Sequence, residues 1–167
     1  MAVVLLGVDP GVKGVATAVL DARGELLFSR FFRTPSSPEG LGWAESVQEA
    51  VRSLEGLPLT RVWIEFPQVY GRSKAPAEDL LRIAAVSGAL AVSLRASFPE
   101  AAVRFVLPYA WKRNVPKEVM LRRIFDALSP EEKSRIEEKR ITYVGDALDA
   151  VGIAKWAFKH NPGDGLE

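Results

Sequence analysis

Four carboxylate residues occupy positions from which they could meet at one end of a sheet. Asp9 ends an apolar run at a Pro-Gly turn, and Glu65 closes a second short apolar segment. Asp146 and Asp149 are three residues apart, so a helix places both on one face. If the four converge, their combined charge is balanced by two divalent cations, and oxygen-only ligands favour Mg²⁺ or Mn²⁺. Paired cations of this kind activate water for phosphodiester hydrolysis.

Each carboxylate also has a purely structural explanation. Asp9 is equally typical of a turn, where its side chain accepts hydrogen bonds from nearby amides. Glu65 fits one half of a salt bridge at a sheet edge, with Arg61 as its partner. Acidic residues near a helix N-terminus stabilise the helix, although this effect fades after the first turn and so explains Asp146 better than Asp149. The spacing alone leaves both explanations open.

The composition restricts the other kinds of catalysis. The chain has no cysteine and a single histidine, His160. These counts exclude disulfides, thiolate zinc sites, cysteine nucleophiles and histidine-rich metal sites, and they weigh against a Ser-His-Asp triad. We expect His160 to be solvated and without a functional role. Any catalysis by this chain therefore depends on carboxylates.

The basic residues are clustered although the net charge is only +1, from 22 basic and 21 acidic residues. Six basic residues lie between Arg104 and Arg123, against Glu118 alone. A charge run of this kind is either a solvated face or a surface for a polyanion. Together with a carboxylate cluster, it predicts a metal-dependent nuclease.

The elements that must position these residues follow from the hydrophobic pattern and the turn signals. We predict strands over 2–8, 15–20, 25–32, 61–65 and 103–107, and helices over 41–54, 76–97, 116–128, 130–140 and 143–158. Three strands joined by short turns form a meander, and the later strands join by parallel crossovers. The predicted fold class is α/β, a ribonuclease H-like mixed five-stranded sheet flanked by helices. No linker is evident, so 1–167 is predicted to be one domain.

The apolar segments indicate a location. The longest strongly apolar runs, 2–8 and 86–94, are shorter than the ~18–20 residues that a membrane span requires. No secretory signal precedes a cleavage site. We therefore expect a cytoplasmic protein with no membrane partner.

Three ordered motifs resemble those of the RuvC family of Holliday junction resolvases: Gly7-Val8-Asp9-Pro10-Gly11, Ile64-Glu65, and Gly145-Asp146-Ala147-Leu148-Asp149-Ala150. The segments around Phe66 and around Trp111-Lys112 resemble the phage-encoded branch more than the bacterial one, and a phage-encoded protein would lie in the host cytoplasm. The resemblance implies a crossover junction endodeoxyribonuclease that acts on four-way DNA junctions. Such enzymes nick two opposed strands symmetrically and leave 5′-phosphate and 3′-hydroxyl ends.

The resemblance also implies a cofactor and a second copy of the chain. Asp9, Glu65, Asp146 and Asp149 correspond to a tetrad that binds two Mg²⁺ ions per active site, with Mn²⁺ as a possible substitute. A twofold homodimer suits a twofold substrate. Its interface would be the helix over 76–97, in which the small residues Ala84, Gly88 and Ala91 allow close approach. Packing of that helix onto its own sheet is the alternative explanation.

The same resemblance implies the DNA contacts. Lys112, Lys117 and Arg113 correspond to phosphate-contacting positions, and Lys13 would face the scissile phosphate. An aromatic residue that probes junction bases is expected in the longer segment after Glu65. Tyr70, beside Arg72 and Lys74, is the first candidate for stacking on an unpaired base, and Phe66 is the second.

Three other functions remain open from the sequence. One is a broader structure-selective nuclease that cuts branched or flap DNA. Another is a phosphate-binding ATPase module, because Asp9-Pro10-Gly11 also resembles the phosphate turn of actin-like kinases, although those proteins generally need two such domains. The last is a catalytically inactive junction-binding protein, which the complete set of carboxylates disfavours.

Overall fold

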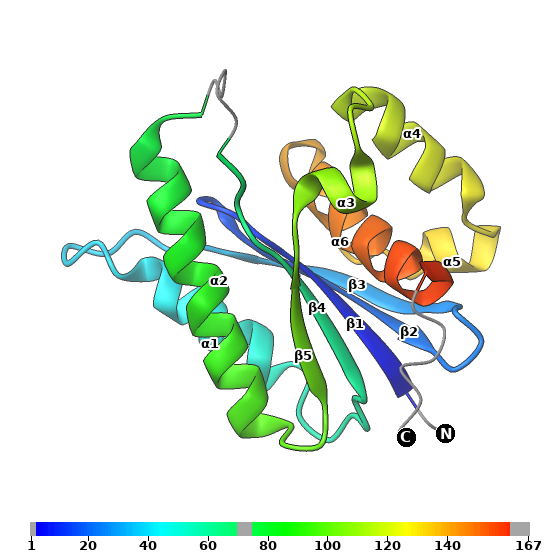
Figure 1. Cartoon of the computed structure of the whole chain (residues 1–167), viewed down its shortest axis with the longest axis horizontal. Coiled ribbons are helices and arrows are strands. Elements are labelled where there is room, and N and C mark those ends of the chain that lie inside the picture. The colour runs from blue at the N-terminus through cyan, green and yellow to red at the C-terminus, as the bar shows by residue number, and fades with distance from the viewer. Residues whose placement is uncertain (1–2, 70–74, 161–167) are drawn as a thin grey trace.

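The sheet has the order β3-β2-β1-β4-β5 in the computed structural model, which describes residues 3–69 and 75–160 (Figure 1). Its strands are β1 (Val3–Pro10), β2 (Gly14–Asp21), β3 (Leu26–Arg33), β4 (Arg61–Glu65) and β5 (Ala102–Val106). The first three pair antiparallel, whereas β4 lies parallel to β1 and β5 parallel to β4. The predicted mixed five-stranded sheet is confirmed.

Helices cover both faces of this sheet (Figure 1). One face carries α1 (Gly42–Arg52) and α2 (Ala77–Ser97), which bury Leu6 and Val8 of β1. The other face carries α6 (Ile141–His160), with α3 (Pro108–Lys112), α4 (Lys117–Ala127) and α5 (Pro130–Ser134) around it. Because successive strand residues point to opposite faces, Leu5 and Gly7 of β1 face α6.

The approach of α6 to β1 is unusually close at Gly7. A Cβ atom at this position would lie 2.6 Å from the Ala150 carbonyl oxygen and 2.7 Å from the Ala154 amide nitrogen. Only glycine leaves room for the helix backbone here. Asp9 is two residues further along the same face of β1, so this contact fixes the position of α6 relative to Asp9.

The helices differ from the predicted ones in two places. The five-residue helix α3 was not predicted, and the helix predicted over 130–140 ends at Ser134. The chain leaves α5 because it turns to bond with the edge strand β3. There the Ser29 amide donates to the Arg135 carbonyl, and the Glu137 amide donates to the Ser29 carbonyl. These two bonds cover part of a sheet edge that would otherwise be unpaired.

Helix α2 is long and apolar. By length and composition alone it is the one helix in the described part of the chain that could cross a membrane. It packs Val86, Leu90 and Leu94 onto the sheet. A second stripe consists of Leu81, Ala85, Gly88, Val92 and Ala96, all of which are exposed except Gly88, which is partly buried. Only one side of α2 therefore packs into the hydrophobic core.

Candidate metal centre and its basic rim

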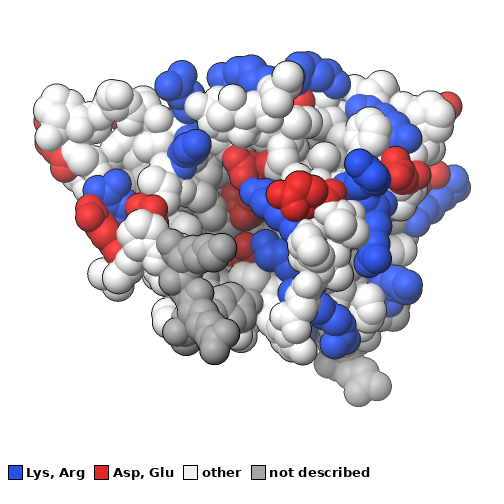
Figure 2. Space-filling model, turned by 90° about the horizontal axis from the view of Figure 1, so that it is seen from above, with Lys and Arg blue, Asp and Glu red and all other residues white. Residues whose placement is uncertain are grey.

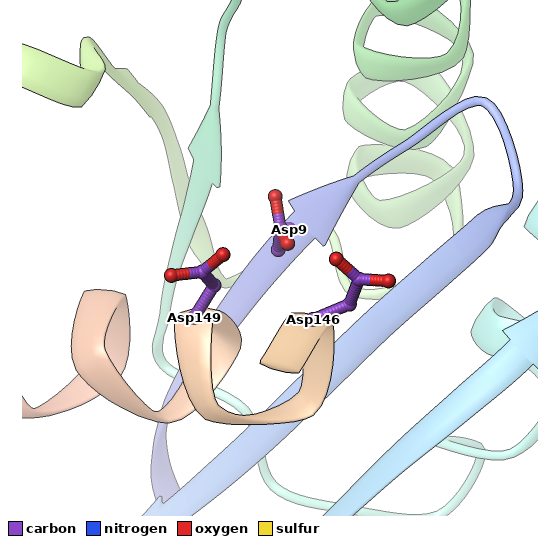
Figure 3. A group of neighbouring side chains, drawn as sticks. All are labelled: Asp9, Asp146 and Asp149. Atoms are coloured by element: carbon purple, nitrogen blue, oxygen red, sulfur yellow. The ribbon is translucent and has the colours of Figure 1, made fainter. Parts of the chain in front are cut away.

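Three of the four predicted carboxylates come together between β1 and α6. One oxygen from each of Asp9, Asp146 and Asp149 lies within 4.8 Å of the others. Figure 3 shows all three side chains directed into the same space. Asp9 pairs with Ala16 of β2, so it lies inside β1 and not in the turn that follows. The predicted helical face for Asp146 and Asp149 is present, and Asp149 is only 6% exposed.

Glu65 lies beside this cluster at the end of β4. Its Oε2 atom accepts a hydrogen bond from the Trp111 indole at 2.5 Å and lies 3.4 Å from the Lys112 ammonium. Glu65 is outside the 4.8 Å group, yet it is close enough for its charge to raise the pKa of Asp9. Because β4 lies between β1 and β5, the sheet-edge explanation of Glu65 is wrong.

The carboxylates carry more negative charge than their surroundings stabilise. Burial raises the pKa of Asp9 well above its ordinary value, and the charges of Asp149 and Glu65 raise it further. Burial also raises the pKa of Asp149 to about 6, although Lys112 and Lys117 oppose the change. The pKa of Asp146 is raised by burial as well, against the effect of Lys117 and Lys13. A divalent cation would supply the missing positive charge.

Three of the lysines that are expected to contact DNA lie close to the carboxylate cluster. Burial alone would lower the pKa of Lys112, but the carboxylates of Glu65, Asp149 and Asp9 outweigh this effect and raise it. The ammonium of Lys117 lies 3.8 Å from Asp149 Oδ2, and this side chain is 61% exposed. Lys13 is exposed and lies close enough to Asp146 to lower its pKa. Lysines therefore approach the aspartates from β1–β2, α3 and α4.

A cavity of about 270 Å³ opens beside Asp149, lined by Pro108, Lys112, Arg113, Asn114, Val115, Lys117, Met120 and Asp149. Arg113 is exposed and ends α3 with φ of 50°, a conformation that is strained for a residue with a side chain. Figure 2 shows the acidic group near the middle of this end of the molecule, with Lys and Arg side chains around it. An anionic group entering the cavity would meet the side chains of Lys112, Arg113 and Lys117, with Asp149 in the same lining.

The candidate base-probing residues are only partly placed. Tyr70, Arg72 and Lys74 lie outside the described residues. Phe66 is partly buried and packs against Phe105, with ring centroids 4.9 Å apart, as expected of a packing residue. His160 is exposed and its ring stacks on Trp156.

No role was predicted for Trp111, which directly precedes Lys112 in the sequence. The indole contact with Glu65 joins residues 46 positions apart. No periodicity indicates such a contact, because α3 is a single short turn of helix. Gly152 of α6 lies against the Trp111 ring.

No family model and no curated protein matches this chain in sequence. Its structure superposes on Thermus thermophilus RuvC in complex with a Holliday junction substrate, with a TM-score of 0.68, 20% identity, and coverage of 95% of this chain and 96% of that one. The chain has the RuvC fold. A second Thermus thermophilus RuvC structure gives a TM-score of 0.63 at 19% identity, covering 93% and 95% of the two chains.

The yeast mitochondrial Holliday junction resolvase is also similar, with a TM-score of 0.51, 15% identity, and coverage of 94% of this chain and 82% of that one. At these identities the likeness is one of fold. It confirms the predicted ribonuclease H-like fold class and the RuvC-like arrangement that the motifs indicated.

Proposed function

We propose that this chain is a metal-dependent endonuclease that resolves four-way DNA junctions. The observation that carries the proposal is the meeting of Asp9, Asp146 and Asp149 from opposite ends of the chain. They meet in a fold shared with a RuvC whose structure holds a Holliday junction. The lysines and the cavity beside the aspartates suit a phosphate backbone.

The donor set fits hard divalent cations. Asp9, Asp146 and Asp149 would hold them, and Glu65 would complete the set by turning its free oxygen toward Asp9. Two Mg²⁺ ions, or Mn²⁺ in their place, would supply Lewis acidity for the attacking water and the leaving oxygen. Cation binding would compete with protonation of Asp9 and Asp149, because both carboxyl groups have raised pKa values.

The basic residues beside the carboxylates, Lys13, Lys112, Arg113 and Lys117, form a basic rim that would position the DNA. Lys117, Lys112 and Arg113 are proposed to contact phosphates along one strand, and Lys13 to approach the scissile phosphate. Such contacts fix the register of the backbone without reading its sequence. Stacking of Tyr70 on an unpaired base, assisted by Arg72 and Lys74, remains a prediction from the sequence.

A second copy of the chain is proposed to cover the exposed side of α2. Leu81 and Val92 are each 72% exposed, and Gly88 between them has open space around it. These residues are seven and four positions apart, which places them on one stripe of the helix. Small residues along a stripe allow two such helices to approach closely about a twofold axis, as a symmetric dimer requires. Two active sites would then face two opposed strands of one junction.

The test is cleavage of a labelled, immobile four-way junction in the presence of Mg²⁺. We expect paired, symmetric nicks with 5′-phosphate and 3′-hydroxyl ends. Asp146→Asn should abolish cleavage while junction binding persists, because Lys117 and Arg113 remain. Asp126→Asn is the matched control, since Asp126 is exposed on α4.

Other substrates distinguish the neighbouring functions. Equal cleavage of linear duplex would contradict a junction-selective enzyme. Equal cleavage of four-way, three-way and flap substrates, with linear duplex spared, would instead indicate a broader structure-selective nuclease. If Asp146→Asn lost binding as completely as cleavage, the assignment of its carboxylate to metal binding would fail.

A further inference from the structure

The Trp111 side chain is buried, and its single polar atom, Nε1, donates a hydrogen bond to Glu65. The side chain is 7% exposed, and its indole N–H donates to Glu65 Oε2 at 2.5 Å. Indole has one donor and no acceptor, and a buried donor requires a partner. A hydrogen bond to an ionised carboxylate is stronger than one between neutral groups. The bond is therefore a firm and directional constraint on Glu65.

The indole ring is itself held in place by packing. Trp111 shares a buried cluster with Val106 of β5 and Ile153 of α6. A Cβ atom on Gly152 would lie 2.6 Å from Trp111 Cζ3, so the ring rests on a place in α6 where only glycine fits. Gly152 follows Asp149 by one turn of the helix. The same ring thus touches the helix that carries Asp149 and holds the carboxylate of β4.

The two contacts of Glu65 differ in how they respond to a cation. Both are made by Oε2, and the described residues show no such contact at Oε1, the other carboxylate oxygen. The Lys112 ammonium is positively charged and would be repelled by a divalent cation at this site. The indole is neutral, so it can keep its hydrogen bond when a cation arrives.

We propose that Trp111 is a positioning residue for the metal centre: it holds Glu65 through Oε2 and directs Oε1 to a divalent cation shared with Asp9 and Asp149. This inference rests on the proposed function in requiring a cation at the aspartates. Glutamate at the end of a strand has several side-chain rotamers, and the indole selects one of them before the cation binds. Lys112 is then free to leave Glu65 for a phosphate.

The first test measures Mn²⁺ affinity by isothermal titration calorimetry in the absence of DNA. Trp111→Phe keeps an aromatic ring and removes the donor, so we expect affinity to fall about tenfold, the lower end of the range for partners of metal ligands. Trp156→Phe is the matched control, because Trp156 packs on the same cluster and contacts Trp63 and His160 rather than Glu65. Its Mn²⁺ affinity should equal that of the unaltered chain.

A double-mutant cycle separates positioning from general damage. In a Glu65→Gln background, Trp111→Phe should cause no further loss of Mn²⁺ affinity, since the carboxylate that it orients is absent. An equal loss in both backgrounds would overturn the proposal, and so would full affinity in Trp111→Phe alone. If the unaltered chain itself bound no Mn²⁺, the proposed metal centre would fail instead.

A spectroscopic measurement needs no altered tryptophan. The Trp111 indole N–H should give a proton resonance shifted downfield by its charged acceptor, and this shift should persist when Mg²⁺ saturates the site. Glu65→Gln should move the resonance toward that of an indole with a neutral partner. Movement to that position on addition of Mg²⁺ alone would show that the bond breaks when the cation binds, and would overturn the proposal.

Discussion

Asp149 is stabilised poorly by its own protein when no cation is present. Its carboxylate is almost fully buried, and burial raises its pKa to about 6 from an ordinary value of 3.8. Above pH 6 the ionised Asp149 carboxylate lowers the free energy of unfolding, because the charge is less favourable in the folded chain than in the unfolded one. Between about pH 6 and pH 4 the folded chain binds the proton more tightly than the unfolded chain does. This destabilisation therefore disappears as the pH falls through that range.

We expect Asp149→Asn to stabilise the metal-free protein at pH 8. Removing the charge should raise the free energy of unfolding by about 1–3 kcal/mol, the upper limit being the full pKa shift converted to energy. At pH 4 the two proteins should have nearly equal stability. Urea unfolding in the presence of EDTA at both pH values measures the difference.

Exposed Asp126 again provides the control, because Asp126→Asn on α4 should leave stability unchanged at either pH. A loss of stability in Asp149→Asn at pH 8 would show that the carboxylate is satisfied without a cation. Such a result would contradict the idea that the cluster is built for a bound metal.

Much of the site at this scale was predictable from residue type and spacing. Carboxylates at strand ends and at helical spacing led to Asp9, Glu65, Asp146 and Asp149, and the structure brings three of them within 4.8 Å. The partners of Glu65 were not predictable. Its contact with Trp111 depends on how β4, α3 and α6 pack in three dimensions, and no local pattern encodes that packing.

At the scale of elements, the close packing of α6 against β1 brings Asp146 and Asp149 near Asp9. Gly7 allows the backbones to approach, and Ala150 and Ala154 supply the facing small residues. Strands were predictable because alternation and turn residues mark them, and β4 was predicted with its observed bounds. The short helix α3 and the early end of α5 were not, because five residues give no periodic signal.

Gly7→Ala should weaken both the fold and the metal site. The added methyl group would lie 2.6 Å from the Ala150 carbonyl oxygen, so α6 must move away from β1. We expect a loss of roughly 1–3 kcal/mol in the free energy of unfolding, typical of overpacking a core, together with weaker Mn²⁺ binding. Chemical denaturation and calorimetry measure the two effects.

Gly145→Ala is the matched control on α6 itself. A Cβ atom there would meet only the flexible end of Leu121, at 3.3 Å, and alanine favours the helix. Stability should therefore be maintained or slightly increased. If Gly7→Ala retained the Mn²⁺ affinity of the unaltered chain, the close contact would not be what aligns the acidic residues.

At the scale of the whole molecule, the acidic cluster and the exposed apolar stripe lie on two distinct surfaces. The end of the sheet holds the acidic group and its basic rim, whereas α2 lies on the sheet face opposite α6 (Figure 1) and carries an exposed apolar stripe. Both Leu81 and Val92 are mostly exposed on that stripe. Contiguous exposed apolar surface often marks an interface.

Val92→Glu should prevent the proposed dimer and leave the metal centre intact. A charge placed on a twofold stripe meets its own copy, and two like charges in an apolar contact are unfavourable. Analytical ultracentrifugation should show a dimer for the unaltered chain and an 18.3 kDa monomer for the variant. Junction cleavage should then give single nicks in place of paired ones.

Gln48→Glu adds the same charge to an exposed position on α1 and serves as the control, with no expected change in mass or nicking pattern. If Val92→Glu remained dimeric, the second copy would have to bind elsewhere. If the unaltered chain were a monomer that still made paired nicks, symmetric cleavage would not need two copies.

Among the described elements, β1 comes first in the chain and α6 comes last. Asp9 and Asp149 are therefore far apart in sequence, and the cation site that we propose is complete only after α6 has been synthesised and has folded back onto β1. If the chain has the nuclease activity that we propose, a translation product terminated before α6 would be unable to cut nucleic acid.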